Sequence, residues 1–175
     1  MRPFPLSGIA AIFFLLFLLV LSCGCGDYVP NHDIIVIALH PDGTGAWSRT
    51  LDTGYDDVAA GIVETANGEL MIAAGNATGR YRSTTPKLVR LSRNGTVFAE
   101  LPCPELKGEL TAIIRTSDGN LSAATYDGQV GRFDPGGNLT GVAETGMTGV
   151  WSLAPAPGGG VAAAGALSQL YPAGS

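Results

Sequence analysis

Leu39-His40-Pro41-Asp42-Gly43-Thr44 is a short phrase whose pattern returns three more times along this 175-residue chain. Each copy ends an apolar run, turns through residues such as proline, asparagine and glycine, and continues with a small polar residue. The later copies read LSRNGT at 91–96, FDPGGN at 133–138 and LYPAGS at 170–175. Repetition at intervals of about 40 to 50 residues indicates a solenoid or a propeller. The sequence therefore predicts a repeat protein.

A second kind of turn alternates with the first. It reads TANG at 65–68, TSDG at 116–119 and APGG at 156–159. Asn-Gly and Asp-Gly supply the positive φ angles that tight hairpins need. Short apolar or alternating runs lie between the turns, which is typical of β-strands, and no segment after Asp33 keeps a 3.6-residue apolar period. We therefore expect an all-β fold, with helix only in the N-terminal apolar segment.

Taken in order, the two turns define units of four strands. Complete units are predicted at 56–101 and 109–145, and partial units at 33–52 and 149–175. Four antiparallel strands repeated at this interval make up the blade of a β-propeller, so the predicted fold class is an all-β, partial β-propeller of about three to three and a half four-stranded antiparallel blades. This repeat domain spans 33–175 and follows an N-terminal signal helix.

Such a propeller would be open. Closed propellers have four to eight blades, and unpaired strand edges invite pairing with another chain. Two explanations follow: the chain is a truncated piece of a longer propeller, or it closes by self-association through its open strand edges. We favour truncation, because the sequence ends inside the fourth copy of the turn phrase.

The N-terminal segment predicts export. Arg2 supplies a positive charge, and an uninterrupted apolar run covers 9–21. That run is shorter than the roughly 20 residues that a membrane-spanning helix needs, but it suits the apolar region of a secretory signal. We therefore expect an exported protein at the cell surface.

The residues that follow resemble a lipobox, the prokaryotic pattern of aliphatic and small residues before a cysteine that receives lipid. Here the pattern is VLSC at 20–23, in which Leu21 stands where a smaller residue is usual. The predicted organisation is a lipoprotein-type signal peptide at 1–22, lipid attachment at Cys23 and a tether at 23–32, so that lipid or signal helix anchors the protein to the membrane. The alternatives are an ordinary signal peptide cut near Gly26 and an uncleaved anchor helix.

Charge and motif content narrow the function. The 10 Lys and Arg residues are scattered and are outnumbered by 15 Asp and Glu residues, so no nucleic acid partner is expected. His32 and His40 stand apart from other ligand-type residues, so no metal site is predicted. The common enzyme and cofactor motifs are absent, and we expect no catalytic residues and no cofactor. Pairing of Cys25 with Cys103 is left open.

Two kinds of candidate site remain. Four Asn-x-Ser/Thr sequons are candidate glycosylation sites, and three of them coincide with hairpin turns, where asparagine is favoured for its backbone conformation anyway. They begin at Asn76, Asn94, Asn120 and Asn138. Trp151 lies on the strand expected to be innermost in its unit, where it would reach the central channel as a stacking platform for a sugar or a quinone. Of the two roles, we favour core packing of this side chain.

The stretch 46–75, which spans the end of the first partial unit and the start of the first complete unit, matches a known repeat. The stretches AWSRTL at 46–51, YDDVA at 55–59, IVETANG at 62–68 and MIAAG at 71–75 resemble exported prokaryotic β-propeller repeat lipoproteins, of the quinoprotein or WD-repeat-like propeller superfamily. The resemblance covers 33 to about 165, although the later units keep the turns and lose the Trp and Asp-Asp.

The resemblance implies a non-catalytic binding or interaction module at the cell surface, with a protein or a glycan as its ligand. One alternative is part of a quinoprotein-like or glycan-acting propeller enzyme. Another is a gene fragment without function. In the related repeats the Asp-Asp pair, here Asp56-Asp57, ties neighbouring strands together, so we expect it to be structural.

Overall fold

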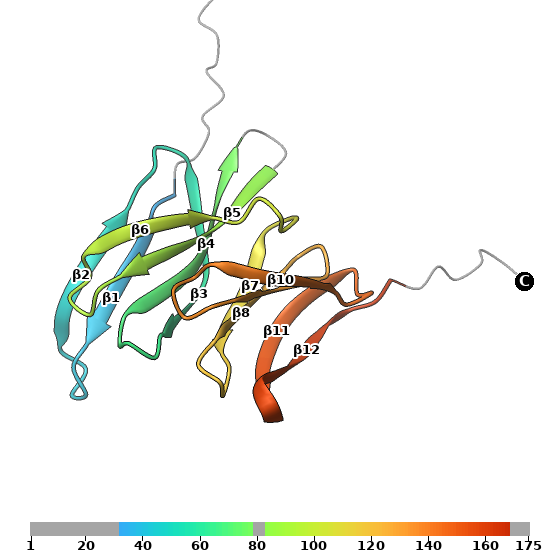
Figure 1. Cartoon of the computed structure of the whole chain (residues 1–175). Helices are drawn as coiled ribbons and strands as arrows, with labels where there is room; N and C mark the ends of the chain where they lie inside the picture. The colour runs from blue at the N-terminus through green and yellow to red at the C-terminus, as the bar shows by residue number, and fades with distance from the viewer. Residues whose placement is uncertain (1–31, 79–82, 169–175) are drawn as a thin grey trace, which may run out of the picture. The chain divides into compact units, whose positions relative to one another are not determined.

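The computed structural model describes residues 32–78 and 83–168, and this part of the chain is all-β (Figure 1). It contains no α-helix, and its one helical element is a short 3-10 turn, Pro157–Gly159. The predicted all-β class is therefore confirmed for the described residues. The predicted signal helix, most of the tether and the fourth copy of the turn phrase lie outside them.

Twelve strands of the described chain form four antiparallel sheets. Sheet 1 contains β1 (Ile34–Leu39) and β2 (Gly45–Leu51). Sheet 2 contains β3 (Asp56–Glu64), β4 (Leu70–Thr78), β5 (Ser83–Leu91) and β6 (Val97–Pro102). Sheet 3 contains β7 (Leu110–Arg115), β8 (Leu121–Thr125), β9 (Gln129–Phe133) and β10 (Leu139–Glu144). Sheet 4 contains β11 (Gly149–Ala156) and β12 (Gly160–Ala166).

These sheets coincide with the predicted units, but they do not close into a barrel or a ring. One hairpin is longer than its apolar pattern indicates, because that pattern predicts strands only at 69–75 and 87–93. The run of small residues ends at Gly75, whereas the β4–β5 pairing continues to Thr78 opposite Ser83. The residues beyond Gly75 are mostly polar, so they give no apolar pattern. Residues 83–85 nevertheless read Ser-Thr-Thr, and β-branched threonine favours strands although it is not apolar.

Hydrogen bonds and close packing join strand β2 of sheet 1 to the turn between β5 and β6 of sheet 2. In sheet 1, the indole Nε1 of Trp47 donates to the carbonyl of Arg93, 2.9 Å away, and Arg49 Nε donates to the carbonyl of Gly95. Gly95 has a φ of 80°, and a Cβ there would lie 2.7 Å from the Trp47 ring. The glycine of this turn phrase is thus required both by backbone conformation and by the neighbouring indole.

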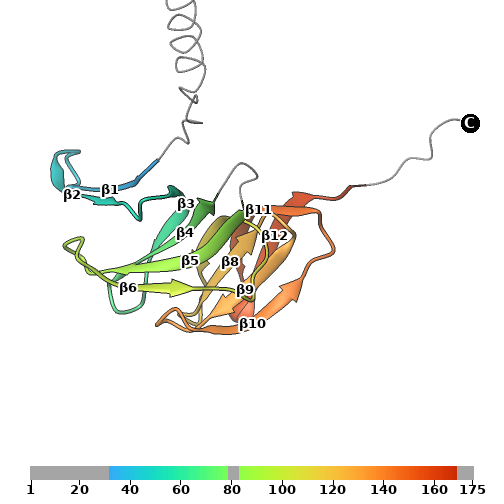
Figure 2. The ribbon, with the colours of Figure 1, turned by 90° about the horizontal axis from the view of Figure 1, so that it is seen from above.

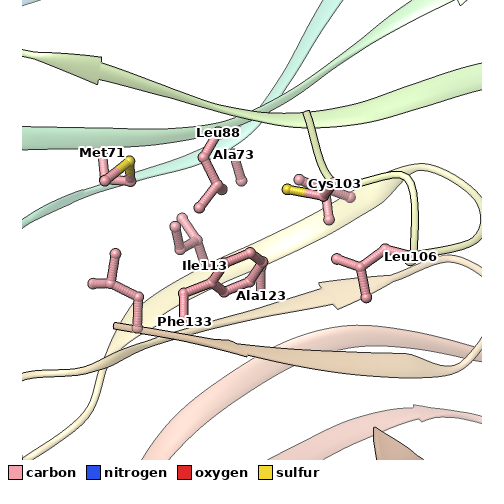
Figure 3. Close-up of a cluster of buried hydrophobic side chains, with 10 residues drawn as sticks. Met71, Ala73, Leu88, Cys103, Leu106, Ile113, Ala123 and Phe133 are labelled. Carbon is pink, nitrogen blue, oxygen red and sulfur yellow. The ribbon is translucent and has the colours of Figure 1, made fainter. Parts of the chain in front are cut away.

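Apolar side chains fill the space between successive sheets. The largest cluster, between sheets 2 and 3, includes Met71, Leu88, Ile113 and Phe133 (Figure 3). A second cluster joins sheet 1 to sheet 2, and a third joins sheet 3 to sheet 4. Each sheet is therefore covered by the next along the chain, an arrangement that can be followed in the view from above (Figure 2).

The first strands of the last three sheets lie next to one another. Strand β3 contacts β7, and β7 contacts β11. We call β3, β7 and β11 the leading strands. The leading strands therefore lie in series, with β7 between β3 and β11.

Candidate ligand-binding site at Trp151

Each leading strand carries a β-bulge at the same position relative to its turn. The pairing register shifts by one residue around Ala60 in β3, around Thr111 in β7 and around Trp151 in β11. A bulge leaves one residue unpaired and re-aims its side chain. The three bulges therefore set three different side chains at one structural position.

The side chains at these bulges have different surroundings. Ala60 packs against the cluster between sheets 2 and 3. The hydroxyl of Thr111 donates to the carbonyl of Val150, at 2.5 Å, and so connects two leading strands. Trp151 is 49% exposed, so about half of its surface is open in the described part of the chain.

Trp151 stacks edge to face with a second exposed aromatic residue, Tyr126. The ring centroids are 5.1 Å apart and the ring planes make an angle of 76°. Tyr126 follows β8 and is 53% exposed. Gly149 allows this approach, because a Cβ there would lie 3.2 Å from the indole and 2.9 Å from the carbonyl oxygen of Tyr126. Two aromatic faces are thus held together at the surface.

The backbone on both sides of the pair is fixed. The Tyr126 amide donates to the carbonyl of Glu109 at 2.8 Å. After Tyr126, the chain turns through Asp127, and the hydroxyl of Thr145 donates to the carbonyl of Gly128. The exposed carboxylate of Asp127 comes directly after the tyrosine. The site therefore presents two aromatic rings in contact at the surface, whereas the Asp127 carboxylate lies over Gly108, in the link between sheets 2 and 3.

Tyr126 was not identified from the sequence. It lies at the end of a strand, beside an Asp-Gly turn, where the pattern indicates only the strand boundary. Its partner is 25 residues further on, in the next sheet. One signal was available. Tyr126 follows the second strand of its unit and Trp151 lies near the start of the first strand of the next unit, and these two positions lie at the same end of antiparallel sheets.

Asp57 belongs to a buried polar network, and this agrees with the structural role predicted for the Asp-Asp pair. Its carboxylate accepts hydrogen bonds from the amide and the hydroxyl of Thr53, in the link between sheets 1 and 2. Lys87 Nζ lies 3.7 Å from Asp57 and 3.0 Å from Glu100. Asp57 and Lys87 are only 4% and 7% exposed, so these two charges pair with each other inside the protein.

His32 contacts the carboxylate of Asp56 through Nδ1. Within 32–78 and 83–168, no group of three or more His, Cys, Asp or Glu side chains is placed to hold a metal ion. In the same ranges, no helix is long and apolar enough to cross a membrane. The predicted anchor, Cys23, lies outside the described residues.

The four sequons occupy different environments. Asn76 lies in β4, where its amide nitrogen donates to Thr53 Oγ1 at 3.0 Å. Asn94, Asn120 and Asn138 lie in hairpin turns, as expected. Asn120 and Asn138 donate to aspartates of their own turns, whereas Asn94 is exposed and its Oδ1 accepts from the hydroxyl of Thr96.

Aspartates in three turns are held in the ionised form. A hydrogen bond from Asn138 is the main cause that lowers the pKa of Asp134, and hydrogen bonds from Thr116 and Thr44 do the same for Asp118 and Asp42. A carboxylate stabilised in this way supports the turn. These carboxylates are turn elements of the repeat.

Cys103 is a free thiol in the cluster between sheets 2 and 3, and it is 2% exposed. Burial raises its pKa to about 11. Since the thiolate is the reactive form, Cys103 is protected from chemistry at neutral pH. Cys25, whose pairing with Cys103 the sequence leaves open, lies outside the described residues.

No protein-family model matches this chain, and no curated protein matches it.

Proposed function

We propose that this chain is a cell-surface, propeller-type module that binds a glycan at the Trp151–Tyr126 site without catalysing a reaction. The proposal includes export and anchoring of the module to the membrane by lipid on Cys23. The observation that carries it is the exposed, edge-to-face aromatic pair on a bulge of a leading strand.

The arrangement of the sheets supports the propeller assignment. Propeller blades are four-stranded sheets repeated around a central channel. Sheets 2 and 3 have four antiparallel strands each, in chain order. Their leading strands β3 and β7 lie side by side, with β11 next in the series. A residue bulged from a leading strand would therefore lie at or near the channel.

The chemistry of the site supports a sugar as ligand. One face of a pyranose ring carries mostly C–H groups, which pack against an aromatic ring, while its hydroxyls need hydrogen-bond partners. Trp and Tyr combine a large apolar surface with a polar group. Because both rings are already in place, binding would require little ordering of the protein.

A retention assay tests the proposal. The full-length protein is incubated with insoluble cellulose, chitin and peptidoglycan, and the bound fraction is measured by sedimentation. We expect retention on at least one polysaccharide and at least tenfold weaker binding after Trp151→Ala, which corresponds to about 1.4 kcal/mol. Phe98→Ala is the matched control, because Phe98 is also an exposed aromatic residue, at 47% exposure, but lies on β6. Equal binding by W151A and the native protein would refute this site.

The anchor needs a separate test. In cells supplied with a labelled fatty acid, we expect the native chain to incorporate label and Cys23→Ser to lose it and to leave the membrane fraction. Cys25→Ser is the control, since it removes a neighbouring thiol and keeps the cysteine of the lipobox pattern. Unchanged membrane retention of C23S would contradict lipid anchoring.

A further inference from the structure

Three turns follow one another at the same end of sheets 2, 3 and 4. They join β3 to β4, β7 to β8 and β11 to β12, and they lie along the lower side of the molecule in Figure 1. A Cβ at Gly119 in the second turn would lie 3.9 Å from the Cβ of Ala66 in the first. The amide of Gly159 in the third turn donates to Ser117 Oγ in the second, 3.2 Å away. Each turn therefore packs on the next.

A hollow of about 360 Å³ lies beside these turns, and we call it the Arg115 hollow. Arg115 is an exposed residue at the end of β7. Ser117 adds a hydroxyl whose oxygen accepts from the Gly159 amide, which leaves the hydroxyl proton for donation. The hollow therefore combines a guanidinium with a hydroxyl donor. Its lining residues are Ala66, Arg115, Thr116, Ser117, Gly119 and Pro155.

The charge of Arg115 has no partner in the described chain. Its guanidinium makes no hydrogen bond or ion pair with any residue of 32–78 and 83–168. The other arginines in these ranges all contact an acceptor, and a solvent-facing cation without one is available to a ligand. Those contacts are Arg49 with the carbonyl of Gly95, Arg90 with Glu69, Arg93 with Glu64, and Arg132 with Asp118 and the carbonyl of Gly159.

The repeat shows that this lack of a partner is particular to sheet 3. Glu64 and Pro155 occupy the position of Arg115 on β3 and β11, since each immediately precedes its turn. In sheet 2 the guanidinium of Arg93 lies 2.9 Å from the carboxylate of Glu64. The position of Arg93 is taken in sheet 3 by Pro135, the third residue of its turn phrase. Sheet 3 thus reverses the charge on its leading strand and lacks the charged partner on its second turn.

Asp118 is the acidic residue of the turn beside the hollow, and its charge is already used. Its Oδ1 accepts from the hydroxyl of Thr116, and its Oδ2 accepts from the side-chain amide of Asn120. Oδ2 also lies 3.8 Å from the guanidinium of Arg132. The same carboxylate lies over Gly159, in the turn of sheet 4. The positive charge of Arg115 therefore remains available to an anion.

We propose that the Arg115 hollow binds the carboxylate of an acidic sugar, so that the ligand is a glycan built from uronic acids. This inference rests on the proposed function. A guanidinium forms two parallel hydrogen bonds with a carboxylate, and the volume of the hollow lies within the range of small-molecule sites. Pro155, in the lining, comes four residues after Trp151 on β11, a strand length of about 13 Å. One extended oligosaccharide can therefore stack on Trp151 and place a carboxylate at Arg115.

Two probes that differ in charge alone test this inference. Oligogalacturonate carries a carboxylate on every ring, and its methyl ester has the same rings and linkages without the charge. Binding of each probe to the full-length protein in mild detergent is measured by isothermal titration calorimetry. We expect the native protein to bind oligogalacturonate at least tenfold more tightly than the ester. Added salt should narrow the difference, because an exposed ion pair is screened.

Three substitutions assign the preference to the hollow. Arg115→Gln should make the affinities for acid and ester equal. Arg115→Lys should retain part of the preference, because it keeps the charge and loses the planar pair of donors. Arg49→Gln is the matched control, since it removes an exposed arginine from sheet 1, and it should leave the preference unchanged. Circular dichroism of each variant confirms that it is folded.

The outcomes separate this inference from the proposed function. Failure to bind oligogalacturonate, equal binding of acid and ester by the native protein, a preference that survives R115Q, or one that R49Q also removes would each overturn the carboxylate site. If the native protein did not distinguish the probes but W151A bound neither, the proposed function would stand and the carboxylate site would fall. If R115Q removed the preference while W151A bound both probes as tightly as the native protein, the carboxylate site would stand and the Trp151 site would fall.

Discussion

Replacing Phe133 by alanine should remove much of the stability of the repeat domain. Phe133 ends β9 and is 0% exposed in the cluster between sheets 2 and 3 (Figure 3). Loss of a fully buried phenyl ring removes about 2–3 kcal/mol of transfer free energy, and the cavity left behind increases the cost. We expect the free energy of unfolding to fall by about 3–5 kcal/mol.

Phe98→Ala is the matched control for this substitution. The same atoms are removed, but Phe98 is 47% exposed, and its ring lies 4.8 Å below the guanidinium carbon of Arg90. About half of the transfer free energy and a cation–π contact of about 0.5–1 kcal/mol are lost. The expected cost is therefore about 1.5–2.5 kcal/mol.

Urea unfolding followed by far-UV circular dichroism measures both variants. With a slope of about 2 kcal/mol per molar urea, F133A should lower the unfolding midpoint by about 1.5–2.5 M and F98A by about 0.7–1.3 M. If F133A lowered the midpoint no more than F98A, the face-to-face packing of sheets 2 and 3 would be wrong. Phe133→Leu should recover most of the loss, because an apolar side chain of similar size refills the cavity.

Three further substitutions test the turns and the buried thiol. Gly95→Ala places a Cβ at a positive φ and against the Trp47 ring, so it should lower the free energy of unfolding in urea by about 1–3 kcal/mol. Gly43→Ala should cost less, because φ is positive there but nothing lies within 4 Å. Equal costs for the two variants would contradict the indole contact. Asn138→Ala should raise the pKa of Asp134, which a hydrogen bond from Asn138 lowers. The stability from that carboxylate is present above its unfolded pKa and lost as pH falls through the folded pKa; an unchanged NMR titration of Asp134 would exclude the bond. The pKa of Cys103 is about 11 in the folded protein, against an ordinary value of 9.0. Above about pH 9 the thiol therefore ionises in the unfolded chain before it does in the folded one. The free energy of unfolding should fall by about 2–3 kcal/mol by pH 11. Cys103→Ala should flatten that decline, and parallel curves would show that the thiol is not buried.

Strand positions were predictable because turn chemistry is local. A turn that needs positive φ selects glycine or asparagine, so the positions of Gly68, Gly95 and Gly119 already mark the hairpins. The β4–β5 hairpin was underestimated for the converse reason. Beyond Gly75 the strands continue through polar residues, and backbone pairing there leaves no apolar pattern.

The candidate site could be predicted only in part. Trp151 was identified from its place on the first strand of its unit, but its exposure depends on a bulge and on the neighbouring sheet. The contact with Tyr126 depends on how two sheets pack and on the space above Gly149. Such information is not local in sequence. The role of Asp57 was easier to infer, since neighbouring residues on a strand point to opposite faces and make a poor catalytic pair.

Open edges and unequal exposure carry different information. An open edge alone identifies no partner, because any strand can pair with exposed backbone groups. The exposure of Ile37 and Ile62 is more specific, since Val89 and Ile113 at the corresponding positions are buried by defined neighbours. The repeat thus provides its own reference for what should cover each position. Within 32–78 and 83–168 no strand supplies that cover for Ile37 or Ile62, so the repeat itself, and not hydrophobicity alone, marks these two side chains as unusually exposed.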